Sequence, residues 1–148
     1  MAQPLANPGT RLHSTLPLMR IRQATLADAR RIQRIVTAEL LIDVPDFHWH
    51  TSAEITRAIR NDEYFVAVLK GRITGILCLR QDTDALWIET IAVARQHQRK
   101  GQGRALVRFA VERAGKLGLP WVRVSMPSAS RSRSPRLSAA TILNCLRV

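Results

Sequence analysis

The segment from Gln98 to Arg104 contains the residue types that a phosphate-binding turn needs. It follows an apolar strand pattern that ends at Val93, and a helical pattern of apolar residues starts just after it. The N–H groups in the first turn of a helix have no partners within the helix, and together with the helix dipole they attract anions. Gly101 and Gly103 lack a Cβ, so phosphates can approach the backbone closely. Three basic side chains add positive charge: Arg99, Lys100 and Arg104. We therefore expect this segment to bind a pyrophosphate.

Two glycines at this spacing also occur where a turn only starts a helix, so the surrounding sequence has to decide between these interpretations. A dinucleotide-binding fingerprint needs a third glycine, but Leu106 stands in its place. That fingerprint also needs a parallel βαβ unit, whereas the strand before this loop ends a predicted antiparallel meander. The chain has no G-x-x-x-x-G-K-[ST] phosphate loop. Both of these nucleotide-binding loops are therefore excluded.

The predicted strand from Ala85 to Val93 places a carboxylate close to the loop. Side chains alternate along a strand, so Glu89 is expected on the same face as Ile91. A carboxylate can accept a proton from a reacting group, directly or through water. Glu89 is therefore a candidate general base. The alternative is that it is a solvated or ion-paired strand residue.

The hydrophobic periodicity predicts a mixed α+β domain whose elements follow the order β-α-α-β-β-β-α-β. The expected strands lie at about residues 21–23, 64–69, 73–80, 85–93 and 121–125. Thr25 with Asp28, and Thr51 with Glu54, have the spacing of capping boxes that start the first two helices. The third helix is expected over residues 101–116. Its predicted buried face consists of Leu106, Phe109, Ala110, Ala114 and Leu117.

The two ends of the chain have a composition different from that of the domain. Residues 1–18 are rich in Pro, Ser and Thr and predict a flexible extension, and residues 19–126 form the predicted domain. Residues 127–148 begin with a run that alternates serine and arginine, which cannot bury a core. Within this tail, residues 139–146 are apolar enough for a short helix or strand.

Composition limits the partners and the compartment. The net charge of +12 in 148 residues favours anionic partners, but the basic residues are spread along the chain, so nucleic acid is not favoured. No apolar run approaches the roughly 20 residues of a membrane span. Cys78 and Cys145 are too isolated for a disulfide framework, which favours a reducing cytoplasm. His48 and His50 have no evident third ligand, so no metal is expected.

The loop, the strand before it and the order of elements together resemble the GNAT N-acetyltransferase superfamily. The stretch Gln98-Arg-Lys-Gly-Gln-Gly103 fits the [RQ]-x-x-G-x-[GA] motif of that family. The resemblance runs from about Met19 to Met126 and includes the opening Ile-Arg-Gln-Ala-Thr-Leu-Ala-Asp of residues 21–28. It implies a central, mostly antiparallel β-sheet flanked by helices, and it implies acetyl-CoA as the co-substrate.

The resemblance also implies roles for particular residues. Backbone amides of the motif would bind the pyrophosphate of coenzyme A, at Gln98, Arg99, Lys100, Gly101, Gln102, Gly103 and Arg104. The end of the preceding strand would hydrogen-bond the pantetheine arm, at Ile91, Ala92 and Val93. Members of the family often place their general base at the position of Glu89. They often use a tyrosine on a helix after the fifth strand as the acid, but the single tyrosine of this chain is Tyr64. Nothing after Met126 matches that pattern, so the C-terminus is atypical.

These observations predict an N-acetyltransferase that uses acetyl-CoA to acetylate a primary amine of a small molecule or peptide. Two alternatives stay open at this point. One is a degenerate family member that binds coenzyme A and turns over poorly, because its C-terminal pattern is missing. The other is a basic, nucleic-acid-associated protein.

Overall fold

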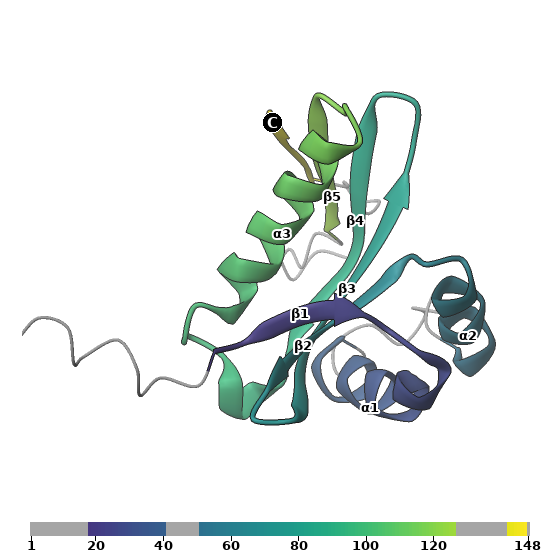
Figure 1. Cartoon of the computed structure of the whole chain (residues 1–148), viewed down its shortest axis with the longest axis vertical. Helices are drawn as coiled ribbons and strands as arrows, with labels where there is room; N and C mark the ends of the chain where they lie inside the picture. Colours follow the sequence, from purple (N-terminus) through teal and green to yellow (C-terminus); the bar gives the residue numbers. More distant parts are fainter. Residues whose placement is uncertain (1–17, 41–50, 127–141, 148) are drawn as a thin grey trace, which may run out of the picture.

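The computed structural model describes residues 18–40, 51–126 and 142–147. They form one six-stranded sheet in the order β1-β2-β3-β4-β5-β6, flanked by helices (Figure 1). The strands are β1 Arg20–Gln23, β2 Tyr64–Leu69, β3 Arg72–Gln81, β4 Ala85–Val93, β5 Trp121–Met126 and β6 Ile142–Arg147. The helices are α1 Ala29–Leu40, α2 Ser52–Arg60 and α3 Gln102–Lys116, with 3₁₀ turns η2 Leu26–Asp28 and η3 Arg95–His97. The predicted fold class and order of elements are confirmed.

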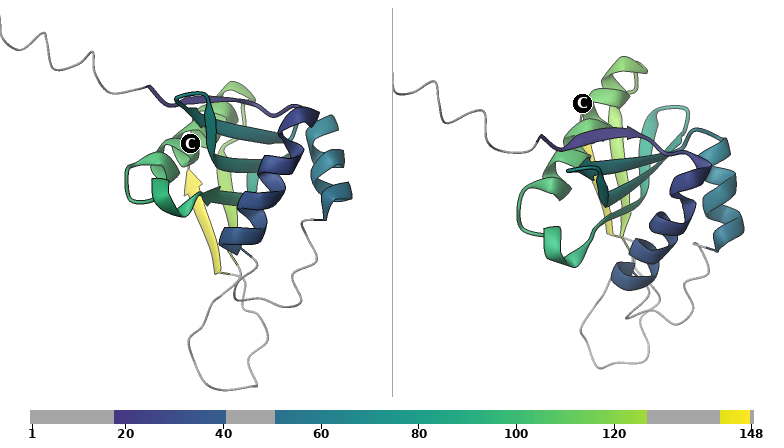
Figure 2. Two further views of the ribbon diagram at one scale, coloured as in Figure 1. Left: turned by 90° about the horizontal axis from the view of Figure 1, so that it is seen from below. Right: turned by 60° about the horizontal axis from the view of Figure 1, so that its bottom comes forward.

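The sheet is antiparallel except where β5 runs parallel to β4. Helices α1 and α2 cover one face, and α3 covers the other, as both views of Figure 2 show. Each face has its own buried apolar cluster. The cluster under α1 and α2 includes Ile32, Ile55 and Ile76. The cluster under α3 includes Leu77, Ile88 and Leu106.

Both predicted capping boxes are present at the starts of the first two helical segments. The carboxylate of Asp28 accepts a hydrogen bond from the N–H of Thr25 at 2.8 Å, and two further bonds from Arg22 at 2.7 and 3.0 Å. At α2, the Thr51 hydroxyl accepts from the N–H of Glu54 at 3.3 Å, while the Glu54 carboxylate accepts from the N–H of Thr51 at 2.9 Å. These side chains satisfy N–H groups that the helices leave free.

Strand β4 contains a bulge that the alternation rule did not predict. Cys78 of β3 pairs with Thr90 and Leu79 pairs with Ile88, so Glu89 is an extra residue on β4. Ile88 before the bulge and Ile91 after it both pack in the cluster under α3. The prediction that Glu89 shares a face with Ile91 was therefore wrong, because a bulge shifts the alternation by one residue.

The end of α3 also differs from the prediction. Leu117 is 42% exposed and does not belong to the buried face, whereas Leu119 is buried. Gly118 takes a positive φ of 71°, and the chain turns there, so that the N–H of Leu119 donates to the carbonyl of Ala114 at 2.9 Å. This left-handed turn ends the helix and directs the second leucine into the core in place of the first.

The C-terminal strand β6 pairs antiparallel with β5 along its whole length, from Trp121 opposite Arg147 to Met126 opposite Ile142. The sequence predicted either a short helix or a short strand for residues 139–146, and the structure has a strand there, β6. Most of residues 1–18, together with residues 127–141, lie outside the described residues, so the predicted domain limits stay predictions.

Candidate functional site

The edge of β4 that faces β5 is open beyond Ile88. Strand β5 pairs with β4 only as far as Val124 opposite Ile88, and no other described strand pairs with β4 on that side. The N–H of Ala94 donates to the carbonyl of Thr74 on β3 at 2.8 Å. Because backbone groups alternate between the two sides of a strand, Ile91 and Val93 direct theirs away from β3. The open edge therefore presents backbone donors and acceptors where a strand would otherwise bind.

The start of α3 lies just beyond this edge. Gly101 is the N-cap residue with a φ of 84°, and no side chain of the described residues caps the helix there. The first turn thus leaves its N–H groups available, at Gln102, Gly103 and Arg104. A Cβ placed on Gly101 or Gly103 would meet no atom within 4 Å, so there is open space where side chains at these two positions would lie. The loop before the helix is tightly turned, since Arg99 also has a positive φ of 59°.

A buried hydrogen bond holds the start of α3 against the sheet. The Thr74 hydroxyl of β3 donates to the Gln102 side-chain oxygen at 2.7 Å. Thr74 is 1% exposed and Gln102 is 6% exposed, so this contact is shielded from water. The Gln102 side chain consequently points into the protein, and only its backbone N–H is available to a ligand. The sequence pattern gave no signal for Thr74.

Helix α1 holds the other end of the loop through Glu39. The Glu39 carboxylate accepts from the N–H of Arg95 at 2.9 Å and from the side-chain amide of Gln98 at 3.1 Å. The same Gln98 amide donates to the carbonyl of Val93 at 2.9 Å. Gln98, the first residue of the motif, therefore joins α1, the end of β4 and the loop. Sequence reasoning missed Glu39, which lies far away in the chain.

A cleft of about 450 Å³ brings the open edge and the loop together. Six of the predicted site residues line it, namely Ile91, Ala92, Val93, Gln98, Arg99 and Gly103, with Glu39, Leu40 and Val107 in addition. The remaining predicted residues do not line it, namely Glu89, Lys100, Gly101, Gln102 and Arg104. The Lys100 ammonium turns back and donates to the carbonyl of Gln96 at 3.3 Å.

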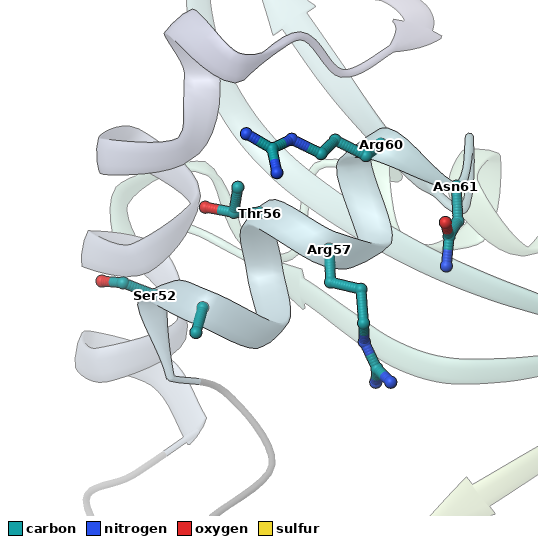
Figure 3. A pocket seen from close by; sticks show the side chains of 6 residues that line it. Ser52, Thr56, Arg57, Arg60 and Asn61 are labelled. Carbon is teal, nitrogen blue, oxygen red and sulfur yellow. The ribbon is translucent and has the colours of Figure 1, made fainter.

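A second hollow, of about 470 Å³, lies along α2 (Figure 3). It is lined by residues of α2 and the turn after it, including Ser52, Thr56 and Arg60. None of the residues that the sequence predicts for the site lies in it. Its lining comes from one helix and the turn after it and has no strand edge, so the cleft at β4 is the candidate site.

Glu89 lies beside the open edge, on the side of the sheet that α1 and α2 cover. It forms an ion pair with the Nε of Arg80 on β3. The side chain of Glu89 is 35% exposed, so it reaches solvent. Nearby, the pKa of Glu63 is raised, first because the carboxyl is partly buried and then because Glu89 is negatively charged. Two carboxylates therefore gather where the edge of β4 opens.

Tyr64 and Cys78 fill the core beneath this cluster. They are cross-strand partners on β2 and β3, and each is at most 5% exposed. Burial is the main cause that raises the pKa of both groups well above the usual range. Tyr64 is thus a protonated core side chain, and Cys78 is a free, buried thiol.

A tryptophan lies between two guanidinium groups on the same surface. The guanidinium carbon of Arg80 is 5.8 Å from the centre of the Trp87 ring, and that of Arg123 is 5.7 Å away. Asp84 accepts two hydrogen bonds from Arg123, at 3.2 and 2.9 Å. Arg123 is therefore neutralised by its own partner, whereas Arg80 is shared between the indole and Glu89.

Within the part of the chain that the structure describes, no group of three or more His, Cys, Asp and Glu side chains is arranged to hold a metal. His48 and His50 lie outside those residues. No helix among the described residues is long and apolar enough to cross a membrane.

The sequence model of the acetyltransferase (GNAT) family matches residues 30–130, which is more than half of the chain. The chain therefore belongs to the GNAT family of acetyltransferases. A search of curated protein sequences finds no match.

Solved structures of acetyltransferases have the same fold. A GNAT-family acetyltransferase from Listeria monocytogenes superimposes with a TM-score of 0.68 at 15% identity, over 88% of this chain and 95% of that one. The ribosomal-protein-S18-alanine N-acetyltransferase from Escherichia coli gives 0.62 at 18% identity, over 77% and 70%. N-acetylglutamate synthase from Neisseria gonorrhoeae, complexed with coenzyme A and N-acetyl-glutamate, gives 0.66 at 20% identity. It covers 75% of this chain, which spans only 26% of that longer protein.

Proposed function

We propose that this protein transfers the acetyl group of acetyl-CoA to a primary amine. The observation that carries the proposal is that the uncapped start of α3 and the open edge of β4 line one side of the molecule and share one cleft. A ligand with a diphosphate at one end and an amide-containing arm at the other needs both features. Free N–H groups at the helix start suit the diphosphate, and the strand edge suits the amides.

The residues at the cleft fit coenzyme A. Space is open in front of Gly101 and Gly103, where side chains would otherwise obstruct the phosphates. Arg99 lines the cleft and adds positive charge, and Arg104 is exposed in the first turn of α3. The backbone groups of Ile91 and Val93 would receive the pantetheine arm, with the carbonyl of Val93 already bonded by Gln98. In this family, bound acetyl-CoA supplies an activated thioester.

Glu89 is the residue that we propose as the general base. In the reaction, the amine nitrogen forms a bond to the thioester carbonyl carbon, the carbon–sulfur bond breaks, and the nitrogen loses a proton. Glu89 would accept that proton, directly or through water. It reaches solvent at the point where β4 leaves β5, two residues before the proposed pantetheine contact at Ile91. The ion pair with Arg80 holds the Glu89 carboxylate in place.

Two of the similar structures contain an amino acid or its N-acetyl derivative together with coenzyme A. Diaminobutyrate acetyltransferase from Paenibacillus lautus was solved with its substrate L-2,4-diaminobutyric acid and coenzyme A. It superimposes on this chain with a TM-score of 0.59 at 18% identity, over 75% of this chain and 67% of that one. These complexes support a small-molecule acceptor for this chain. The buried free thiol of Cys78 supports a reducing compartment such as the cytoplasm.

A second candidate is a protein that binds coenzyme A with little turnover. The observation that favours it is the position of Tyr64, the single tyrosine, which is 2% exposed in the core under α1 and α2. In that position it is shielded from solvent and does not line the cleft, so no tyrosine side chain is available there to protonate the leaving thiolate. Water would then have to supply that proton.

A thiol-release assay with acetyl-CoA and a panel of amines separates the two candidates. Glu89→Gln should leave the affinity for coenzyme A unchanged and slow acetyl transfer about a hundredfold, most visibly at lower pH, where fewer amines are unprotonated. Glu112→Gln, on the exposed side of α3, is the matched control and should behave like the wild type. Equal rates for wild type and Glu89→Gln would remove Glu89 from the mechanism. Binding of coenzyme A without release of thiol for any amine would favour the second candidate.

A further inference from the structure

The ion pair between Arg80 and Glu89 leaves hydrogen-bonding atoms on both side chains without a partner among the described residues. Arg80 binds Glu89 through its Nε, and neither Nη atom has a hydrogen bond to a described residue. Glu89 receives this bond on Oε1, and its Oε2 has no bonded partner among the same residues. Both side chains reach solvent, with 47% and 35% of their side-chain surface exposed. A free carboxylate oxygen and a free guanidinium end therefore lie next to each other beside the open edge of β4.

Such a pair is complementary to a zwitterion. An α-amino acid has an ammonium group and a carboxylate on the same carbon atom. Its two charges are therefore as close together as those of the ion pair, and each can face the oppositely charged side chain. The ammonium would bind at Glu89, and the carboxylate would take two parallel hydrogen bonds from the Nη end of Arg80. This places the reacting nitrogen at the proposed base.

The neighbouring groups strengthen this match. Arg123 is bound on both of its Nη atoms by Asp84, so Arg80 is the guanidinium beside Trp87 whose terminal N–H groups are free within the described residues. Glu63 adds a second carboxylate near Glu89, which favours an ammonium there. The partly buried Trp87 ring offers an apolar surface for the acceptor's side chain.

We infer that the acceptor is a free α-amino acid, whose carboxylate is bound by Arg80 while its amine lies at Glu89. This inference rests on the proposed function. It distinguishes free amino acids from two other acceptor classes. A peptide N-terminus has a neutral amide in place of the carboxylate, so it would leave the Nη end of Arg80 without an anionic partner. A polyamine would bring a second positive charge against the guanidinium, which is unfavourable.

The test compares acceptors that differ only in the carboxylate. Thiol release from acetyl-CoA is measured with a panel of L-amino acids and with the carboxamide of each one. We expect the best amino acid to exceed its carboxamide in kcat/KM by about tenfold or more, since the amide loses a charge-assisted pair of hydrogen bonds. Calorimetric titration of the same two acceptors into the protein saturated with coenzyme A should show the same preference.

Arg80→Lys tests the assignment to one side chain. Lysine retains the positive charge beside Glu89 but lacks the planar end that binds a carboxylate at two points. We expect this variant to reduce the preference for the amino acid over its carboxamide by about tenfold, mainly through KM. Arg72→Lys is the matched control, because Arg72 is exposed at the opposite end of the same strand. It should retain the wild-type preference.

The outcomes separate this inference from the proposed function. If carboxamides react as well as amino acids, or if Arg80→Lys keeps the full preference, the acceptor assignment is overturned while the acetyltransferase function stands. It is also overturned if the protein binds coenzyme A but acetylates no amino acid in the panel. If the protein does not bind coenzyme A, the proposed function itself fails.

Discussion

We expect the hydrogen bond between the Thr74 hydroxyl and Gln102 to be the contact that most stabilises the start of α3. The change that tests it is Thr74→Val, which keeps the shape of the side chain and removes the hydroxyl. The Gln102 side-chain oxygen, now 2.7 Å from its donor, would then lack a partner. Because Gln102 is only 6% exposed, water cannot easily replace the lost donor.

The expected size of the effect follows from this burial. A buried acceptor left without its hydrogen bond costs about 1–3 kcal/mol in the free energy of unfolding. In a chain of this size each kcal/mol lowers the melting temperature by about 2–4 °C. The affinity for coenzyme A should fall as well, because Thr74 fixes the residue that begins α3 and presents the free N–H groups.

Urea unfolding of four proteins measures this prediction: the wild type, Thr74→Val, Gln102→Leu and the double variant. Each single change should destabilise the protein, and the double variant should recover part of the loss, since it replaces both polar partners with apolar groups. Thr37→Val, on the exposed side of α1, is the control for the substitution itself. If Thr74→Val is as stable as the wild type, or if the two single effects simply add, the hydrogen bond does not hold the helix in place.

Two further predictions concern other parts of the chain. Gly101→Val should lower the affinity for coenzyme A by at least about tenfold, because it fills the space before the helix start and forces a branched residue to a φ of 84°. Gly71→Val is the control, because Gly71 has a similar φ of 74° in the β2–β3 turn and the substitution causes similar backbone strain. The control should be destabilised to a comparable extent and should keep the wild-type affinity for coenzyme A. Equal affinities of the two variants for coenzyme A would count against the cleft as the binding site. Hydrogen bonds from Arg22 hold the pKa of Asp28 below its usual value of 3.8, so this carboxylate stabilises the fold above pH 3.8 and that stability is lost as the pH falls through the lowered pKa. Asp28→Asn should therefore lower the free energy of unfolding by about 1 kcal/mol at neutral pH, a small value because the Arg22 side chain is 43% exposed. In urea unfolding, the difference between this variant and the wild type should vanish in acid. A difference that stays constant at all pH values would contradict this linkage.

Local sequence signals were sufficient to predict most of the fold. The strands at residues 64–69 and 85–93 have the bounds that the apolar and β-branched runs predicted. The glycine loop was found because its residue types have a local meaning, namely no Cβ, positive charge and a following helix. In such segments the information is contained in a few neighbouring residues.

The features that were missed depend on contacts between distant segments. The bulge at Glu89 has no glycine or other local mark, and it arises from the way β4 pairs with β3. Glu39 joins the loop from 56 residues away in the chain, and Thr74 from 28. The choice between Leu117 and Leu119 depended on how the chain turns at Gly118, which periodicity does not contain. Pairing register and long-range hydrogen bonds are tertiary properties, so composition and spacing could not show them.

The central claim is that exposed N–H groups at the start of α3 bind the diphosphate of coenzyme A. Calorimetric titration of the purified chain with coenzyme A, and in parallel with pantetheine, tests it most directly because pantetheine has no phosphates. We predict saturable binding of coenzyme A at one site and binding of pantetheine that is about a hundredfold weaker or undetectable. Equal affinities for the two ligands, or no heat with either, would contradict the claim.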